Sequence, residues 1–104
     1  MELNITTDPK PECYSIAVGG EIDISCASKL RTAIDMAFEQ PADEVKLDFG
    51  DVSYIDSTGI GVLVGMAQNA QRRRKRFSIV NCQPGVMRVA HLLGVDTEVS
   101  ISGR

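Results

Sequence analysis

Apolar and polar residues alternate over several short stretches of the chain, and over others apolar residues recur every three or four positions. Strict alternation is typical of a half-buried strand, whereas the longer spacing is typical of an amphipathic helix. Asp-Pro-Lys-Pro at 8–11 and Gly-Asp at 50–51 are expected to be turns. The pattern predicts strands over 3–7, 13–18, 44–49, 77–80 and 97–101, an extended segment over 52–55, and helices over 25–40, 57–74 and 84–93.

The order of these segments favours one class of fold. After an opening hairpin, strands alternate with helices, which favours a mostly parallel sheet with helices packed against it. The 104 residues are an ordinary length for one domain. We therefore expect an α/β fold formed by a single domain over 1–104, with an N-terminal hairpin strand and about three helices.

The chain also gives an expectation about its compartment. Its first residues lack the basic stretch and apolar run of a secretory signal. The longest strongly apolar run, 60–67, is far shorter than the roughly 20 residues of a membrane span. Cys13, Cys26 and Cys82 are odd in number and far apart, which indicates reduced thiols rather than a disulfide framework or a zinc site. We expect a cytoplasmic protein.

Charge is divided unevenly along the chain. Residues 1–56 carry 12 acids and four bases, whereas residues 57–104 carry seven bases and two acids. Five of those bases are consecutive, at 72–76, at the end of the second predicted helix. Cations favour a helix C-terminus, although one or two suffice. The net charge of −3 and the lack of aromatic residues within the run argue against nucleic-acid binding, so we expect no specific nucleic acid and no membrane as partner.

The segment 56–61, Asp-Ser-Thr-Gly-Ile-Gly, is the best candidate for chemistry. Ser57 falls at or beside the start of the second helix, where its hydroxyl could act as an N-cap. Enzyme motifs fit poorly: no P-loop lysine follows the glycines, the glycine spacing departs from a dinucleotide fingerprint, and the sole histidine, His91, has no orienting acid close in sequence. The residues thus indicate no catalysis, no metal and no cofactor.

A second acidic segment, 20–23, follows the second predicted strand, and Asp23 or Ser25 could cap the first helix. In a parallel sheet the loops at the carboxyl ends of the strands share one edge. We therefore expect Asp23 to lie on the same edge as the 56–59 turn.

The chain resembles the STAS domain family, and within it the small bacterial anti-sigma factor antagonists. Gly-Glu-Ile-Asp at 20–23 is similar to a family segment that precedes the first helix. The strand at 45–49 followed by Ile-Asp-Ser-Thr-Gly-Ile-Gly at 55–61 is similar to the family signature, and 92–96 is similar to the segment that closes its third helix. The middle segment is the specific one, and the resemblance covers nearly the whole chain.

The resemblance implies a partner switch. The unmodified antagonist would bind a serine/threonine kinase that is also an anti-sigma factor, which frees the sigma factor. Phosphorylation of the turn, at Ser57 or else at Thr58, would release the antagonist, and a serine phosphatase would reset it. The implied partner-binding residues are Asp23, Asp56, Ser57, Thr58 and Gly59.

Other functions stay open at this point. One is a STAS scaffold that is not phosphorylated, in a sensor complex or as a regulatory subunit of a transporter. Another is a small phosphotransfer or nucleotide-binding protein. The oligomeric state is left as a monomer or a weak dimer.

Overall fold

A computed structural model of the chain describes residues 3–104 and contains one five-stranded sheet. Strand order follows the sequence, with β1 antiparallel to β2 and every other neighbouring pair parallel. The predicted α/β fold is therefore confirmed. The elements are β1 Asn4–Pro9, β2 Cys13–Ile22, α1 Ala27–Phe38, β3 Glu44–Ile55, α2 Ser57–Arg72, β4 Arg76–Cys82, α3 Pro84–Leu92, a 3₁₀ turn Val95–Thr97 and β5 Ser100–Gly103.

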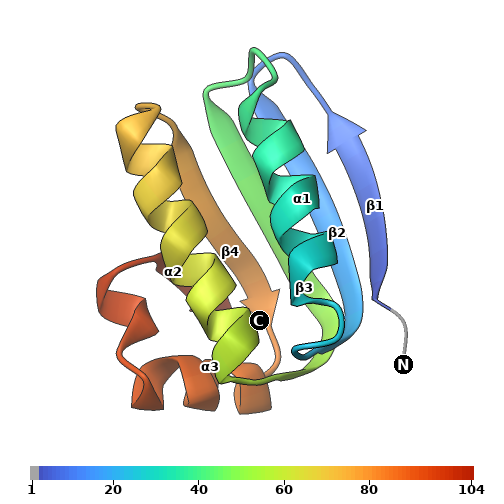
Figure 1. Ribbon diagram of the computed structural model, residues 1–104, viewed down its shortest axis with the longest axis vertical. Helices are drawn as coiled ribbons and strands as arrows, with labels where there is room; N and C mark the ends of the chain where they lie inside the picture. The colour runs from blue at the N-terminus through green and yellow to red at the C-terminus, as the bar shows by residue number, and fades with distance from the viewer. Residues whose placement is uncertain (1–2) are drawn as a thin grey trace.

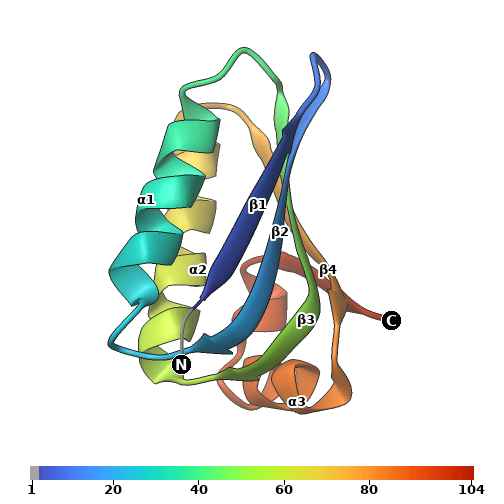
Figure 2. The ribbon, with the colours of Figure 1, turned by 90° about the vertical axis from the view of Figure 1, so that its right-hand side faces the viewer.

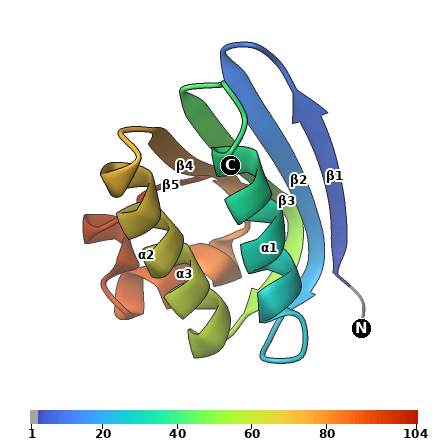
Figure 3. The same ribbon diagram turned by 45° about the horizontal axis from the view of Figure 1, so that its top comes forward.

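The helices are distributed unequally over the sheet. Helices α1 and α2 lie side by side on one face, and α3 lies at the lower end of the sheet (Figures 1 and 2). Viewed from above, the α1–α2 layer stands in front of β2, β3 and β4 (Figure 3). Between this layer and the sheet lies an aliphatic core, whose fully buried members include Ile16, Leu30, Ile34, Val45, Leu47 and Leu63.

The turn predicted at 50–51 is wrong, because β3 continues through it to Ile55. Ala17 of β2 pairs with Asp48 and Gly19 pairs with Asp51, so β3 places one residue more than β2 between these pairs. This is a β-bulge, which absorbs an extra residue without ending the strand. Gly50 and Asp51 therefore bend β3 instead of reversing it.

The last predicted strand, 97–101, starts too early. Val95–Thr97 forms a 3₁₀ turn, and β5 begins at Ser100. Val95 and Val99 are both buried in that turn region, so their apolar character reflects packing of the connection and not the alternation of a strand. A burial pattern alone does not separate these two cases.

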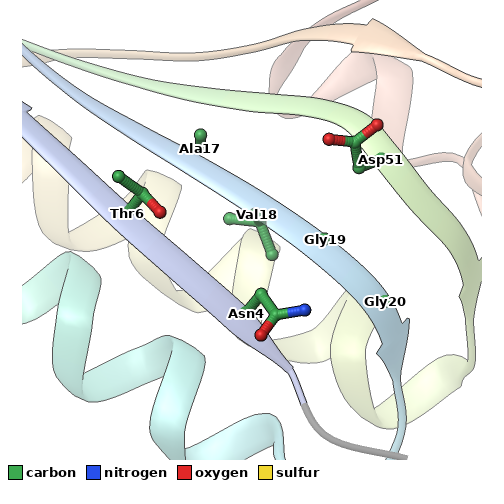
Figure 4. Close-up of a pocket in the computed structure, with 7 residues that line it drawn as sticks. All are labelled: Asn4, Thr6, Ala17, Val18, Gly19, Gly20 and Asp51. Carbon is green, nitrogen blue, oxygen red and sulfur yellow. The ribbon is translucent and has the colours of Figure 1, made fainter.

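The face of the sheet opposite α1 and α2 has a shallow hollow of about 360 Å³ over the bulge (Figure 4). Asn4 and Thr6 of β1 and Asp51 of β3 border it. The hollow exists because β2 carries only Ala17 and Gly19 here, so the longer side chains of the neighbouring strands stand above it.

Candidate functional site

Two loops meet at the carboxyl edge of the sheet. Strands β2 and β3 are parallel neighbours that end at Ile22 and Ile55. The backbone N–H of Asp56 donates to the carbonyl oxygen of Ile22 at 3.1 Å, which ties the start of the turn to the end of β2. The structure thus brings Asp23 and the 56–59 turn to one edge, as the strand order predicts.

The N-cap of α2 is Asp56, not Ser57. The Asp56 backbone is extended, and its Oδ1 accepts the N–H of Gly59 at 3.0 Å. Ser57 is the first helical residue and its side chain is exposed, as is that of Thr58. The expectation that Ser57 caps the helix is therefore wrong. Because Asp56 performs this task, the Ser57 hydroxyl is accessible to a partner.

Gly59 fits its place only because it lacks a side chain. A Cβ there would lie 2.7 Å from Cγ2 of Ile22 and 2.7 Å from Cγ1 of Ile55, nearer than real carbon atoms approach. The first turn of α2 therefore sits directly on the ends of β2 and β3. Gly59 thus allows a close backbone approach, and this contact fixes the height of Ser57 above the edge.

Asp23 organises the neighbouring loop. Its Oδ1 accepts the N–H of Ser25 at 2.9 Å and the Ser25 hydroxyl at 2.5 Å. These hydrogen bonds lower the pKa of the Asp23 carboxyl. The N-cap residue of α1 is Cys26 and makes no side-chain cap hydrogen bond. The expectation that Asp23 or Ser25 caps α1 is thus wrong: the two form a turn just before the helix.

Two exposed apolar side chains at the same edge were missed from the sequence. Ile24 follows Asp23 and is 79% exposed, and Tyr54 near the end of β3 is 49% exposed. Single exposed apolar side chains are common on protein surfaces, and these two matter here only because they lie at the edge that carries the 56–59 turn. An apolar residue inside an otherwise polar loop was the available signal for Ile24.

Other chemically active side chains lie in ordinary structural roles. Nδ1 of His91 is 2.9 Å from Oδ2 of Asp96, an exposed pair that links the end of α3 to the 3₁₀ turn. The expectation that no acid close in sequence orients His91 is therefore wrong, since Asp96 follows it by five residues. Cys26 and Cys82 are buried and free. Burial raises the pKa of the Cys82 thiol to about 11, which keeps it protonated and unreactive at neutral pH.

Within residues 3–104, none of the helices combines the length and the apolar character needed to span a bilayer.

A mixed sheet with two helices on one face, and a capped Asp-Ser-Thr-Gly turn at its carboxyl edge, defines a class of small α/β domains. The chain matches the family model described as Mlab, STAS domain, over residues 5–102. It therefore belongs to this STAS domain family, which confirms the resemblance seen in the sequence.

Individual relatives agree with this assignment. An anti-sigma-B factor antagonist of Staphylococcus epidermidis is 28% identical over 95 residues, or 91% of this chain and 88% of the relative. The crystal structure of an anti-sigma factor antagonist from Mycobacterium paratuberculosis covers 99% of this chain and 87% of its own, with a TM-score of 0.87 and 21% identity. Phosphorylated SpoIIAA of Bacillus covers 94% and 90%, with a TM-score of 0.71 and 21% identity.

Proposed function

We propose that this chain is an anti-sigma factor antagonist whose binding to its partner is controlled by phosphorylation of Ser57. The partner is an anti-sigma factor with serine/threonine kinase activity, and a serine phosphatase restores the unmodified form. The chain acts in the cytoplasm as a binding protein and kinase substrate, with no catalysis of its own. The observation that carries the proposal is the exposure of Ser57 on the edge where Asp56, and not Ser57, caps α2.

The local geometry tolerates a phosphate at this position. The N–H groups of Gly59 and Ile60 already donate to Asp56, so a phosphate on Ser57 would reach the amides of the first two helical residues. Anions are favoured at a helix N-terminus. Phosphorylation should therefore leave the fold intact and act on the surface alone.

The same phosphate opposes binding of a partner at the edge. It adds about −1.5 to −2 charges at neutral pH. These stand next to Asp56 and on the same edge as Asp23 and the exposed apolar Ile24. A partner seated there would have to desolvate the dianion. Weakening a complex a thousandfold needs only about 4 kcal/mol, which one buried, unpaired charge can supply.

The described roles of the relatives agree with the proposal. Staphylococcal relatives that align over nine-tenths of this chain are anti-sigma-B factor antagonists. A protein of similar fold has been described in a phosphorylated form. The modified residue and the partners of the present chain are our inference.

The test is phosphate transfer followed by intact mass. Wild type, Ser57→Ala and Thr58→Ala are incubated with a candidate anti-sigma factor kinase and Mg-ATP. We expect wild type and Thr58→Ala to gain the mass of one phosphate and Ser57→Ala to gain none. Gain by Ser57→Ala but not by Thr58→Ala would move the modification to Thr58. No gain in any chain, although the kinase phosphorylates its own known substrate, would favour an unmodified STAS scaffold instead.

A further inference from the structure

The five consecutive bases at 72–76 do not share one role. Lys75 extends its Nζ to the carbonyl oxygen of Ala42 at 2.9 Å and also to that of Gln40, which fastens the loop after α1. Arg76 lies 3.8 Å from Glu44 on the neighbouring strand. These two bases thus have structural partners. Arg72, Arg73 and Arg74, called here the arginine cluster, are exposed at the C-terminal end of α2.

Arg74 occupies a backbone position that favours glycine. Its φ is 58°, in the left-handed region, and it ends α2 with N–H bonds from Arg74 to Gln71 and from Lys75 to Ala70. A side chain in this conformation is unfavourable relative to glycine. At the equivalent position after α3 the same chain has Gly94, with φ 74°. Arg74 is therefore not the residue that helix termination prefers.

Arg72 of the arginine cluster lies near the helix face of Ser57, since at 3.6 residues per turn fifteen residues place it about 60° further round α2, whereas Arg73 and Arg74 end the helix beside it. Four exposed residues, called here the α2 stripe, follow one another at spacings of four, seven and four: Ser57, Gly61, Gln68 and Arg72. The half-buried Gly65 lies between them, and neither glycine adds a side chain to the stripe. Helix α2 runs from the candidate site at its lower end in Figure 1 to the arginine cluster at its upper end. Fifteen residues at 1.5 Å each separate Ser57 from Arg72, or about 22 Å.

We infer that the arginine cluster is a second contact for the partner that binds the Ser57 edge, and that it engages an acidic surface of that protein. This inference rests on the proposed function. A protein that lies along the exposed side of α2 would contact both Ser57 at the start of the helix and the arginine cluster at its end. Because about 22 Å exceeds the screening length of about 8 Å at physiological salt, a phosphate on Ser57 leaves the cluster unaffected. The cluster therefore keeps its charge in both forms of the chain, and its contribution is to guide association.

The surroundings favour a protein over a nucleic acid. The loop that Lys75 and Arg76 contact carries acids, with Glu39 and Asp43 exposed. These acids limit the positive surface to a small area. A protein can offer a few carboxylates to three arginines, whereas an extended polyanion would meet the flanking acids as well.

The test compares two charge-matched double variants. Arg72→Gln/Arg74→Gln spares Arg73, whose Nε donates to Asn69 at 3.2 Å. The control, Lys46→Gln/Arg88→Gln, removes the same charge from the other face of the sheet and from the exposed Arg88 of α3. Association and dissociation rates are measured with the purified anti-sigma factor kinase that binds wild type, at low and physiological salt.

We expect the cluster variant to associate about tenfold more slowly at low salt, with the difference shrinking as salt rises and with little change in dissociation. The control should differ from wild type by less than about twofold. Equal rates for the two double variants overturn this inference alone. Failure of wild type to bind any such kinase overturns the proposed function and this inference with it. A single-stranded DNA 20-mer that binds wild type at physiological salt, but not the cluster variant, would make the cluster a nucleic-acid site and refute the protein contact.

Single variants at Arg74 separate function from structure. Arg74→Gly relieves the backbone strain and removes the charge, so it should melt higher by several degrees, about 4–8 °C, and associate more slowly. Arg74→Lys keeps both the charge and the strain, and should match wild type in both measurements. A lower melting temperature for Arg74→Gly would show that Arg74 is retained for stability, which contradicts the inference.

Discussion

Replacing Gly59 and Gly61 by alanine should change the free energy of unfolding in opposite directions. Both glycines lie in the first turns of α2, and in a helix interior alanine is more favourable than glycine by about 1 kcal/mol. The two positions differ in the room that they leave for a Cβ atom. A Cβ on Gly61 meets nothing within 4 Å, whereas one on Gly59 would lie 2.7 Å from atoms of two isoleucines.

The magnitude at Gly59 follows from this overlap. Ile22 and Ile55 are 0% and 2% exposed at the ends of the central strands, so they have little room to move. Carbon atoms pack at about 3.5–4.0 Å, so the neighbours must retreat by about 1 Å. Overpacking of this kind costs about 1–3 kcal/mol, of which the helical preference of alanine offsets about 1 kcal/mol. We expect Gly59→Ala to lose up to about 2 kcal/mol and Gly61→Ala to gain up to about 1 kcal/mol.

Urea denaturation followed by circular dichroism measures both values, with equal m-values as the check that the unfolded states are comparable. If Gly59→Ala is as stable as Gly61→Ala, the turn does not sit on the strand ends as described. The argument that Gly59 sets the position of Ser57 would then be refuted.

Three smaller predictions follow from the same edge and core. Asp56→Ala should lose about 0.5–2 kcal/mol of stability and Ser57→Ala less than about 0.5 kcal/mol in the same denaturation assay, and the reverse order would contradict the cap assignment. Ser25→Ala should raise the pKa of Asp23 toward its ordinary value in an NMR titration. Because the pKa of Asp23 is lower in the folded state than the unfolded value of 3.8, the ionised carboxylate stabilises the fold above that pH. Wild type should lose this part of its free energy of unfolding as the pH falls through the folded pKa, and Ser25→Ala should lose less of it. Cys82, with its pKa raised to about 11, should resist a thiol reagent at pH 8 until urea unfolds the chain, and rapid labelling of the native protein would show that it is not buried.

The sequence predicted a mostly parallel sheet that opens with a hairpin, and it located the strands best where one face of a strand is buried. Val45, Leu47 and Phe49 alternate with half-buried polar residues, and this pattern places β3 without further information. The continuation of β3 past Gly50 could not be foreseen in the same way. Whether Gly-Asp makes a turn or a bulge depends on the pairing partner, and that partner, Gly19, is 32 residues away in the chain.

The candidate edge was predicted in outline because strand order brings the two loops together. The identity of the cap was not, since Asp and Ser are both good N-cap residues and stand side by side. The choice depends on the backbone angles of Asp56, which are extended because its N–H is held by Ile22. The exposure of Ile24 likewise depends on how the loop is folded around Asp23, and no local pattern encodes it.

The resemblance to STAS domains pointed to Ser57, and the structure places this exposed residue outside the hydrogen bond that caps α2. The same cap assignment simplifies the interpretation of variants at Ser57. Since Asp56 caps α2, substitutions at Ser57 test charge on the edge with little effect on helix stability.

The most direct test of the account is the affinity of the partner anti-sigma factor for wild type, phosphorylated wild type, Ser57→Ala and Ser57→Asp, with a melting curve for each. We expect all four to be folded. Wild type and Ser57→Ala should bind equally tightly, the phosphorylated chain should bind about a thousandfold more weakly, and Ser57→Asp should lie between them because it carries less charge than a phosphate. If the phosphorylated chain, while folded, binds as tightly as Ser57→Ala, a charge at Ser57 does not control the interaction and the central claim is contradicted.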